Sequence, residues 1–187
     1  TLVGGFRPPE DWPYTEQALK EVEAFDLNED PGLQCVPYPM PRITRWPYSQ
    51  HWEISENTIT IAHEQSSTRV LNKTKDLSIP PAHIPDQNGY SVAHLNDSGD
   101  LVVTTRGFVE TKWGSERGVS SSSSKVVTEI YRLVDGGYGL ELEYTITDPD
   151  YLREPVQLGR NFRLIPNYQF TNEPCNIEAA RRHLQFD

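Results

Sequence analysis

Residues 125–146 alternate between apolar and polar side chains on both sides of an Asp-Gly-Gly run at 135–137. This alternation around a turn sequence predicts an antiparallel β-hairpin with one buried face. Leu142 and Tyr144 lie on the apolar face of the second strand. A two-residue turn at either of the two positions within the run puts Tyr131 and Glu129 on that same face. The sequence therefore predicts a carboxylate among apolar side chains.

The chain from residue 50 to residue 172 shows the same β character. Further hairpins are expected around Glu56-Asn57 and between Asn96 and Gly99, and nothing alternates in βαβ fashion. Seven or eight antiparallel strands of this kind predict one closed or nearly closed β-barrel, similar in architecture to a lipocalin. We assign residues 50–172 to this barrel.

The rest of the 187-residue chain completes a single mainly β domain. Residues 1–49 are expected to form an irregular arm (1–14), a helix (15–26) capped by Thr15, and a proline-rich extended strap (35–42). Residues 173–187 are expected to form a short C-terminal helix capped by Asn176.

Charge and hydropathy exclude some partners. The chain has 27 acidic and 17 basic residues, a formal net charge of −10, which argues against nucleic acid or an anionic membrane surface. No apolar run approaches the roughly 20 residues of a membrane span, so no membrane insertion is expected. The sequence is compatible with a homodimer.

The only two cysteines, Cys35 and Cys175, lie near opposite ends of the chain. A disulfide between them suits an oxidising compartment, and two free thiols fit the same count. The five histidines show no tight metal-ligand spacing. We therefore predict a Cys35–Cys175 disulfide, no metal and no cofactor.

Several phrases together resemble a large family of secreted or periplasmic bacterial β-barrel proteins of unassigned function. They are DPGLQCVPYPMPR (30–42), HEQSSTRV with Glu64 and Arg69, GYSVAHLNDSGDLVVTT (89–105), VTEIYRLVDG (127–136), DPDYLREPV (148–156) and EPCN (173–176). The resemblance implies a periplasmic or secreted barrel and names no reaction. This chain departs from the family pattern because Tyr90 replaces a histidine, Ser121 lies near a second histidine position, and Ile130 replaces an arginine.

The candidate catalytic residues are Glu129, Tyr90, Arg69 and Glu64. Burial raises the pKa of a carboxyl group, so Glu129 is a candidate general acid or base. The alternative is a structural ion pair between Glu129 and Arg69 or Arg106. Tyr90 is a candidate proton-relay or oxyanion partner, or an ordinary core tyrosine. Glu64 and Arg69 are candidates for ligand binding, or form a plain salt bridge.

The candidate ligand-binding residues are Ser91, Tyr131, Tyr144, Leu142, Trp52 and His94. We expect the barrel to enclose a small apolar or aromatic molecule. The sequence favours an enzyme of cofactor-free acid/base chemistry, such as isomerisation, elimination or cyclisation. A non-catalytic, lipocalin-like carrier and a cell-envelope interaction module are the alternatives.

Overall fold

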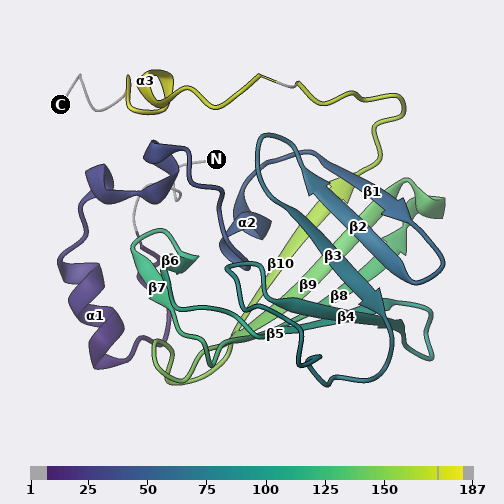
Figure 1. The fold of residues 1–187 in the computed structure, drawn as a ribbon, viewed down its shortest axis with the longest axis horizontal. Coiled ribbons are helices and arrows are strands. Elements are labelled where there is room, and N and C mark those ends of the chain that lie inside the picture. The colour runs from purple at the N-terminus through teal and green to yellow at the C-terminus, as the bar shows by residue number, and fades with distance from the viewer. Residues whose placement is uncertain (1–7, 172, 183–187) are drawn as a thin grey trace.

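The computed structural model describes residues 8–171 and 173–182 (Figure 1). Over these residues, eight strands form one curled sheet, in the order β1-β2-β3-β4-β5-β8-β9-β10, and β6 pairs with β7. The strands are β1 (Gln50–Ile54), β2 (Thr58–His63), β3 (Thr68–Lys73), β4 (Tyr90–Leu95), β5 (Leu101–Arg106), β6 (Thr111–Glu116), β7 (Val119–Ser121), β8 (Val126–Val134), β9 (Gly139–Thr147) and β10 (Val156–Arg163). The helices are α1 (Glu16–Glu23), α2 (Arg42–Arg45) and α3 (Ile177–Ala180), with 3₁₀ turns η1 (Leu27–Glu29), η2 (Pro31–Gln34) and η3 (Asp135–Gly137).

The mainly β prediction is confirmed, but the sheet is more open than the closed or nearly closed barrel that the sequence predicts. The curled sheet is an open half-barrel, because no backbone pairing joins β1 to β10 within the described residues. Arg160 of β10 instead donates to the carbonyl oxygens of Thr44 in α2 and of Trp46, the residue that caps α2 before the chain enters β1. The contacts of the Arg160 side chain thus replace the backbone hydrogen bonds that would pair β1 with β10 in a closed barrel.

The sheet is also not wholly antiparallel. β3 and β4 run parallel, with Leu71 opposite Ser91, while the other neighbouring strands of the large sheet are antiparallel. Residues 74–89 connect the end of β3 to the start of β4, and a parallel pair needs a crossover of about this length. This long loop therefore carries the chain back along the sheet.

The β8–β9 hairpin has the predicted faces. Glu129 lies opposite Tyr144 and Tyr131 lies opposite Leu142, so these four residues share the concave face of the sheet. The connection is longer than a two-residue turn, because η3 and Tyr138 stand between the strands. The longer turn still places the same side chains of the two strands on the same face, so Glu129 points inward as predicted.

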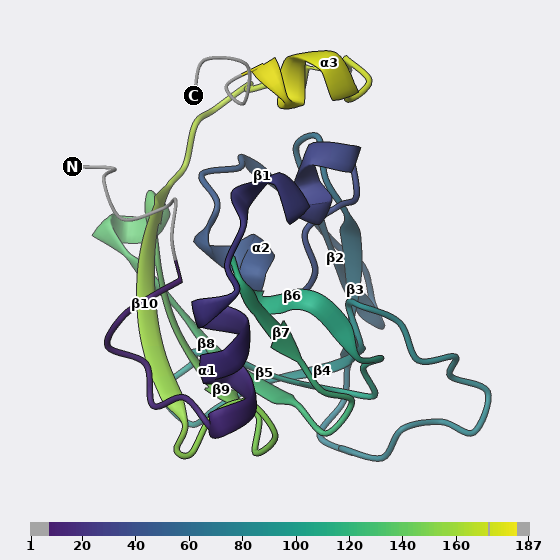
Figure 2. The same ribbon diagram turned by 90° about the vertical axis from the view of Figure 1, so that its left-hand side faces the viewer.

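The N-terminal segment and the β6–β7 hairpin close one end of the half-barrel. Trp12, Tyr14 and Ala18 join Val119 of β7 in the core that covers the concave face. Figure 2 shows α1 lying beside β6 and β7 at this end, and Figure 1 shows the β1–β2, β4–β5 and β8–β9 turns at the opposite end. We call that opposite end the open end.

The two terminal helices agree with prediction within the described residues. Thr15 caps α1, and its hydroxyl accepts a hydrogen bond from the Ala18 amide at 3.3 Å. α1 ends at Glu23, three residues earlier than predicted. Asn176 caps α3 in the same way. The parts of the predictions that fall on 1–7, 172 and 183–187 lie outside the described residues.

The predicted disulfide is confirmed. Cys35 and Cys175 are bonded across 140 residues of sequence and tie the end of η2 to the residues just before α3. Among the helices of residues 8–171 and 173–182, none is long and apolar enough to cross a membrane.

We predict that replacing both Cys35 and Cys175 by serine lowers the free energy of unfolding by about 5 kcal/mol, because the bond closes a very long loop in the unfolded chain. Urea denaturation of wild type and the double variant measures the difference. Two free thiols found by mass spectrometry of the non-reduced protein would contradict the bond itself.

Candidate functional site

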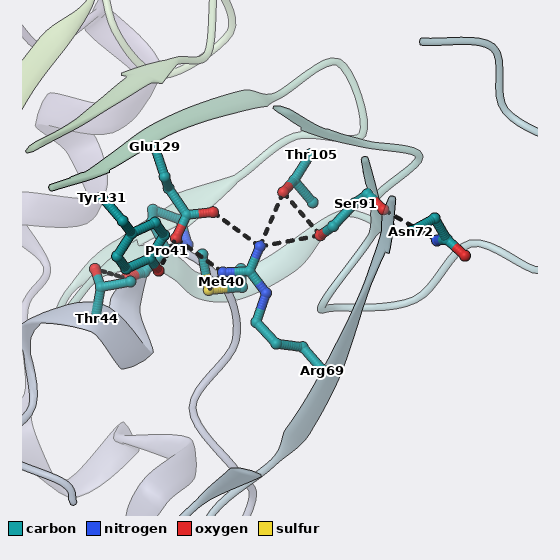
Figure 3. Close-up of polar contacts among 9 residues, drawn as sticks. All are labelled: Met40, Pro41, Thr44, Arg69, Asn72, Ser91, Thr105, Glu129 and Tyr131. Carbon is teal, nitrogen blue, oxygen red and sulfur yellow. Dashed lines mark hydrogen bonds and ion pairs between the residues drawn. The ribbon is translucent and has the colours of Figure 1, made fainter. Parts of the chain in front are cut away.

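The centre of the concave face holds a buried ion pair, Arg69 with Glu129 (Figure 3). Arg69 belongs to β3 and Glu129 to β8, with β4 and β5 between them. The guanidinium binds the carboxylate in a bidentate manner: Nη1 donates to Oε1 at 2.9 Å and Nη2 donates to Oε2 at 2.8 Å. Arg69 is 4% exposed and Glu129 is 0% exposed, so water does not reach the pair.

Three further hydroxyl groups complete this network. The Tyr131 hydroxyl donates to Glu129 Oε1 at 2.7 Å. Arg69 Nη2 donates to Ser91 Oγ at 3.0 Å and to Thr105 Oγ1 at 3.1 Å. We use the name "central network" for Arg69, Glu129, Tyr131, Ser91 and Thr105. Its residues come from β3, β4, β5 and β8, so one cluster joins four strands of the sheet.

Burial and the Glu129 charge act on the two groups that donate to this carboxylate, Arg69 and Tyr131. Burial by itself lowers the pKa of Arg69, but the charge and the hydrogen bonds of Glu129 outweigh burial and raise it. Burial and the Glu129 charge raise the pKa of Tyr131 well above its usual value, so its hydroxyl remains a donor. Both oxygens of the Glu129 carboxylate therefore accept hydrogen bonds inside the network, Oε1 from Arg69 and Tyr131 and Oε2 from Arg69.

Local sequence explains why these side chains meet. The β3 sequence TRVLNK alternates between exposed and buried positions, which turns Arg69 inward together with Leu71. Ser91 lies opposite Thr105 in the β4–β5 ladder, and their hydroxyls are 2.9 Å apart. Small hydroxyl side chains at these positions leave room for the guanidinium and accept hydrogen bonds from it.

Three other predicted ligand-binding residues surround the central network. Leu142 and Tyr144 of β9 are buried on the same concave face. Burial is the main reason why the pKa of Tyr144 is raised to about 12. The Trp52 ring of β1 meets the Tyr131 ring edge to face, with 5.0 Å between centroids, so it reaches across the curl of the sheet.

The remaining predicted residues lie elsewhere. Tyr90 and His94 alternate with Ser91 along β4 and therefore lie on the convex face. The Tyr90 ring contacts the His83 ring there, with 5.3 Å between centroids. Glu64 lies in the turn after β2, where it accepts hydrogen bonds from the Tyr168 hydroxyl and the Thr171 amide. The structure thus separates these three residues from Arg69 and Glu129.

Sequence reasoning missed Lys125, another buried cation on the concave face. Its Nζ donates to the Met40 carbonyl at 2.6 Å and to Ser121 Oγ at 2.8 Å, and it lies 4.2 Å from the centre of the Phe108 ring. Burial lowers its pKa to about 7. The alternation that places Glu129 inward predicts the same for Lys125, four residues earlier, so the signal was present in the sequence.

No family model, curated protein or solved structure matches this chain. Within residues 8–171 and 173–182, no group of three or more His, Cys, Asp or Glu side chains has the arrangement needed to hold a metal ion.

We predict that Glu129→Gln lowers the free energy of unfolding by about 3–5 kcal/mol, because it leaves the Arg69 charge buried without its partner. Chemical denaturation measures this loss. The double variant Arg69→Met/Glu129→Gln removes the stranded charge and should regain most of the stability. A Glu129→Gln protein as stable as wild type would show that the pair is not structural.

A second prediction concerns His63, which is buried on the concave face near Arg69. Burial is the main cause that lowers its pKa from 6.5 to about 4. Between these values the unfolded chain binds a proton that the folded protein does not, so stability falls as the pH drops from 6.5 to 4. The total loss is about 3 kcal/mol.

Urea denaturation at several pH values tests the His63 prediction. His63→Gln should flatten the dependence of stability on pH over this range. His51→Gln, at an exposed histidine on β1, is the matched control and should keep the wild-type dependence. Equal slopes for wild type and His63→Gln would contradict the prediction.

Proposed function

We propose that this protein binds a small apolar or aromatic molecule on the concave face of its half-barrel, at the open end, and acts as a carrier. The observation that supports this most directly is the exposure of large apolar side chains where the concave face is not covered by the N-terminal segment. Ile54, Leu95 and Leu133 are 70%, 62% and 73% exposed, yet each belongs to the inward-facing set of its strand.

These side chains continue a partly buried apolar surface. In the strand register, Leu133 lies opposite Leu140, which lies opposite Phe162. In the next row, Leu95 lies opposite Leu101. Leu101, Leu140, Phe162 and Trp52 are all partly buried against the core. Aromatic and aliphatic side chains gathered on a concave surface are typical of sites for apolar ligands.

The central network supports binding in preference to catalysis. It lies beneath this surface, since Trp52 packs on Tyr131, and its charges satisfy one another. This is the structural ion pair that the sequence left as the alternative for Glu129. Acid/base catalysis by Glu129 would require the carboxylate to leave Arg69. The enzyme therefore stays a prediction, and so do the envelope module and the homodimer.

A secreted or periplasmic location belongs to the same proposal. The Cys35–Cys175 disulfide is compatible with an oxidising compartment, where such bonds persist. We also propose membership of the secreted bacterial family that the sequence resembles, on the motifs quoted above. A carrier that works outside the cytoplasm would gain from a covalent tie between its two ends.

The proposed function is tested with N-phenyl-1-naphthylamine, a neutral apolar probe whose fluorescence rises when it leaves water. We predict that Leu133→Glu weakens its binding about tenfold, because a charge then replaces apolar contact area at the open end. Ile84→Glu is the matched control, since Ile84 is 83% exposed in the loop between β3 and β4.

Equal effects of Leu133→Glu and Ile84→Glu would contradict an apolar site at the open end, and so would a wild-type protein that does not bind the probe. A Glu129→Gln protein that folds and binds the probe but loses a measured turnover would favour the enzyme over the carrier.

A further inference from the structure

A pocket of about 320 Å³ lies far from the open end, between α1 and the β6–β7 hairpin. Phe25, which follows α1, and Trp113 of β6 form part of its wall, and Tyr151 contributes a third aromatic ring. The Phe25 and Trp113 rings are stacked, with 5.4 Å between their centroids. This volume is at the lower end of the range of small-molecule sites.

Trp113 has an unusual backbone conformation. Its φ angle is +53°, in the left-handed region that bulky residues rarely occupy. The irregular register of the β6–β7 pair accompanies this conformation, and the Trp113 amide donates to Ser120 Oγ at 3.2 Å. The bulge thereby directs a large aromatic side chain into the space next to Phe25.

The pocket also carries an excess of negative charge. Glu21, Glu29 and Glu110 line it together with one cation, Lys112. Lys112 pairs with Glu29 at 2.6 Å. Glu21 accepts the Ser120 amide at 2.7 Å with one oxygen, and no hydrogen bond or ion pair reaches the Glu110 carboxylate from the described residues. Two carboxylates thus remain without a cationic partner inside the pocket.

The electrostatic field at Tyr151 agrees with this account. Burial is the main cause that raises the pKa of Tyr151, and the charges of Glu21 and Glu110 raise it further. Two cations of the chain already lie near the centre of the Trp113 ring, the Lys112 ammonium at 5.9 Å and the buried Arg42 guanidinium at 5.7 Å. The ring face is therefore placed where it attracts a positive charge.

We propose that this pocket binds a small organic ammonium ion. Its positive head would lie against the Phe25 and Trp113 rings, with Glu110 and Glu21 balancing the charge. Aromatic faces and nearby carboxylates together recognise an ammonium group by attraction between the cation and the ring electrons and by ordinary charge pairing. A neutral molecule of the same shape gains neither contribution. This site is separate from the proposed apolar site at the open end.

The experiment uses choline and its uncharged isostere 3,3-dimethylbutan-1-ol, each titrated into the full chain by calorimetry at low salt. Choline should bind at least about tenfold more tightly than the alcohol. Phe25→Leu keeps an apolar side chain and removes the ring, and Glu110→Gln removes an exposed charge. Each should weaken choline binding roughly fivefold.

Two further variants control for overall charge. Glu143→Gln removes the same charge from the convex face of β9 and should leave choline binding unchanged. Lys112→Met removes the competing ammonium and frees Glu29, so it should tighten binding. The proposal is overturned if choline does not bind, if the alcohol binds equally well, or if Phe25→Leu and Glu110→Gln leave the choline affinity unchanged. Weaker choline binding by Lys112→Met would overturn it too.

Discussion

The ion pair between Arg69 and Glu129 is the interaction on which the shape of the sheet depends. It joins β3 to β8 across two intervening strands, which only a strongly curled sheet brings within reach. Burying both charges is expensive, and the bidentate geometry with the Tyr131 hydroxyl and two further hydroxyls offsets that cost. The pair also ties together register and curvature, because a slip of one residue in β8 would turn Glu129 to the convex face.

The same centre anchors the N-terminal segment. Met40, at the end of the proline-rich strap, places its sulfur 3.4 Å from Arg69 Nη1 and its carbonyl 2.6 Å from Lys125 Nζ. Met40 thus contacts two of the buried cations, Arg69 and Lys125. Its buried neighbours Ile43 and Phe108 fill the space around it. The strap therefore packs directly on the sheet, although the two are far apart in sequence.

Local periodicity made part of the site predictable. The alternation of β8 and β9 is a short-range property, so it places Glu129, Tyr131 and Leu142 correctly whatever the rest of the fold does. Local periodicity does not predict two other features of the fold. The parallel pairing of β3 and β4 depends on where the loop 74–89 leads, and that loop carries no signal for its direction. At the opening between β1 and β10, Arg160 donates to the carbonyls of Thr44 and Trp46 in and just after α2, a contact between distant parts of the chain.

The position of Tyr90 shows how a resemblance between sequences and a physical pattern can disagree. The motif quoted from 89–105 drew attention to Tyr90 and Ser91 together, but neighbouring residues of a strand point to opposite faces. Ser91 lies in the central network, while Tyr90 packs against His83 outside it. Any residue at position 90 of this strand points to the convex face beside His83. On the concave face Ser91 instead accepts from Arg69, so two neighbouring residues of one strand serve two different surroundings.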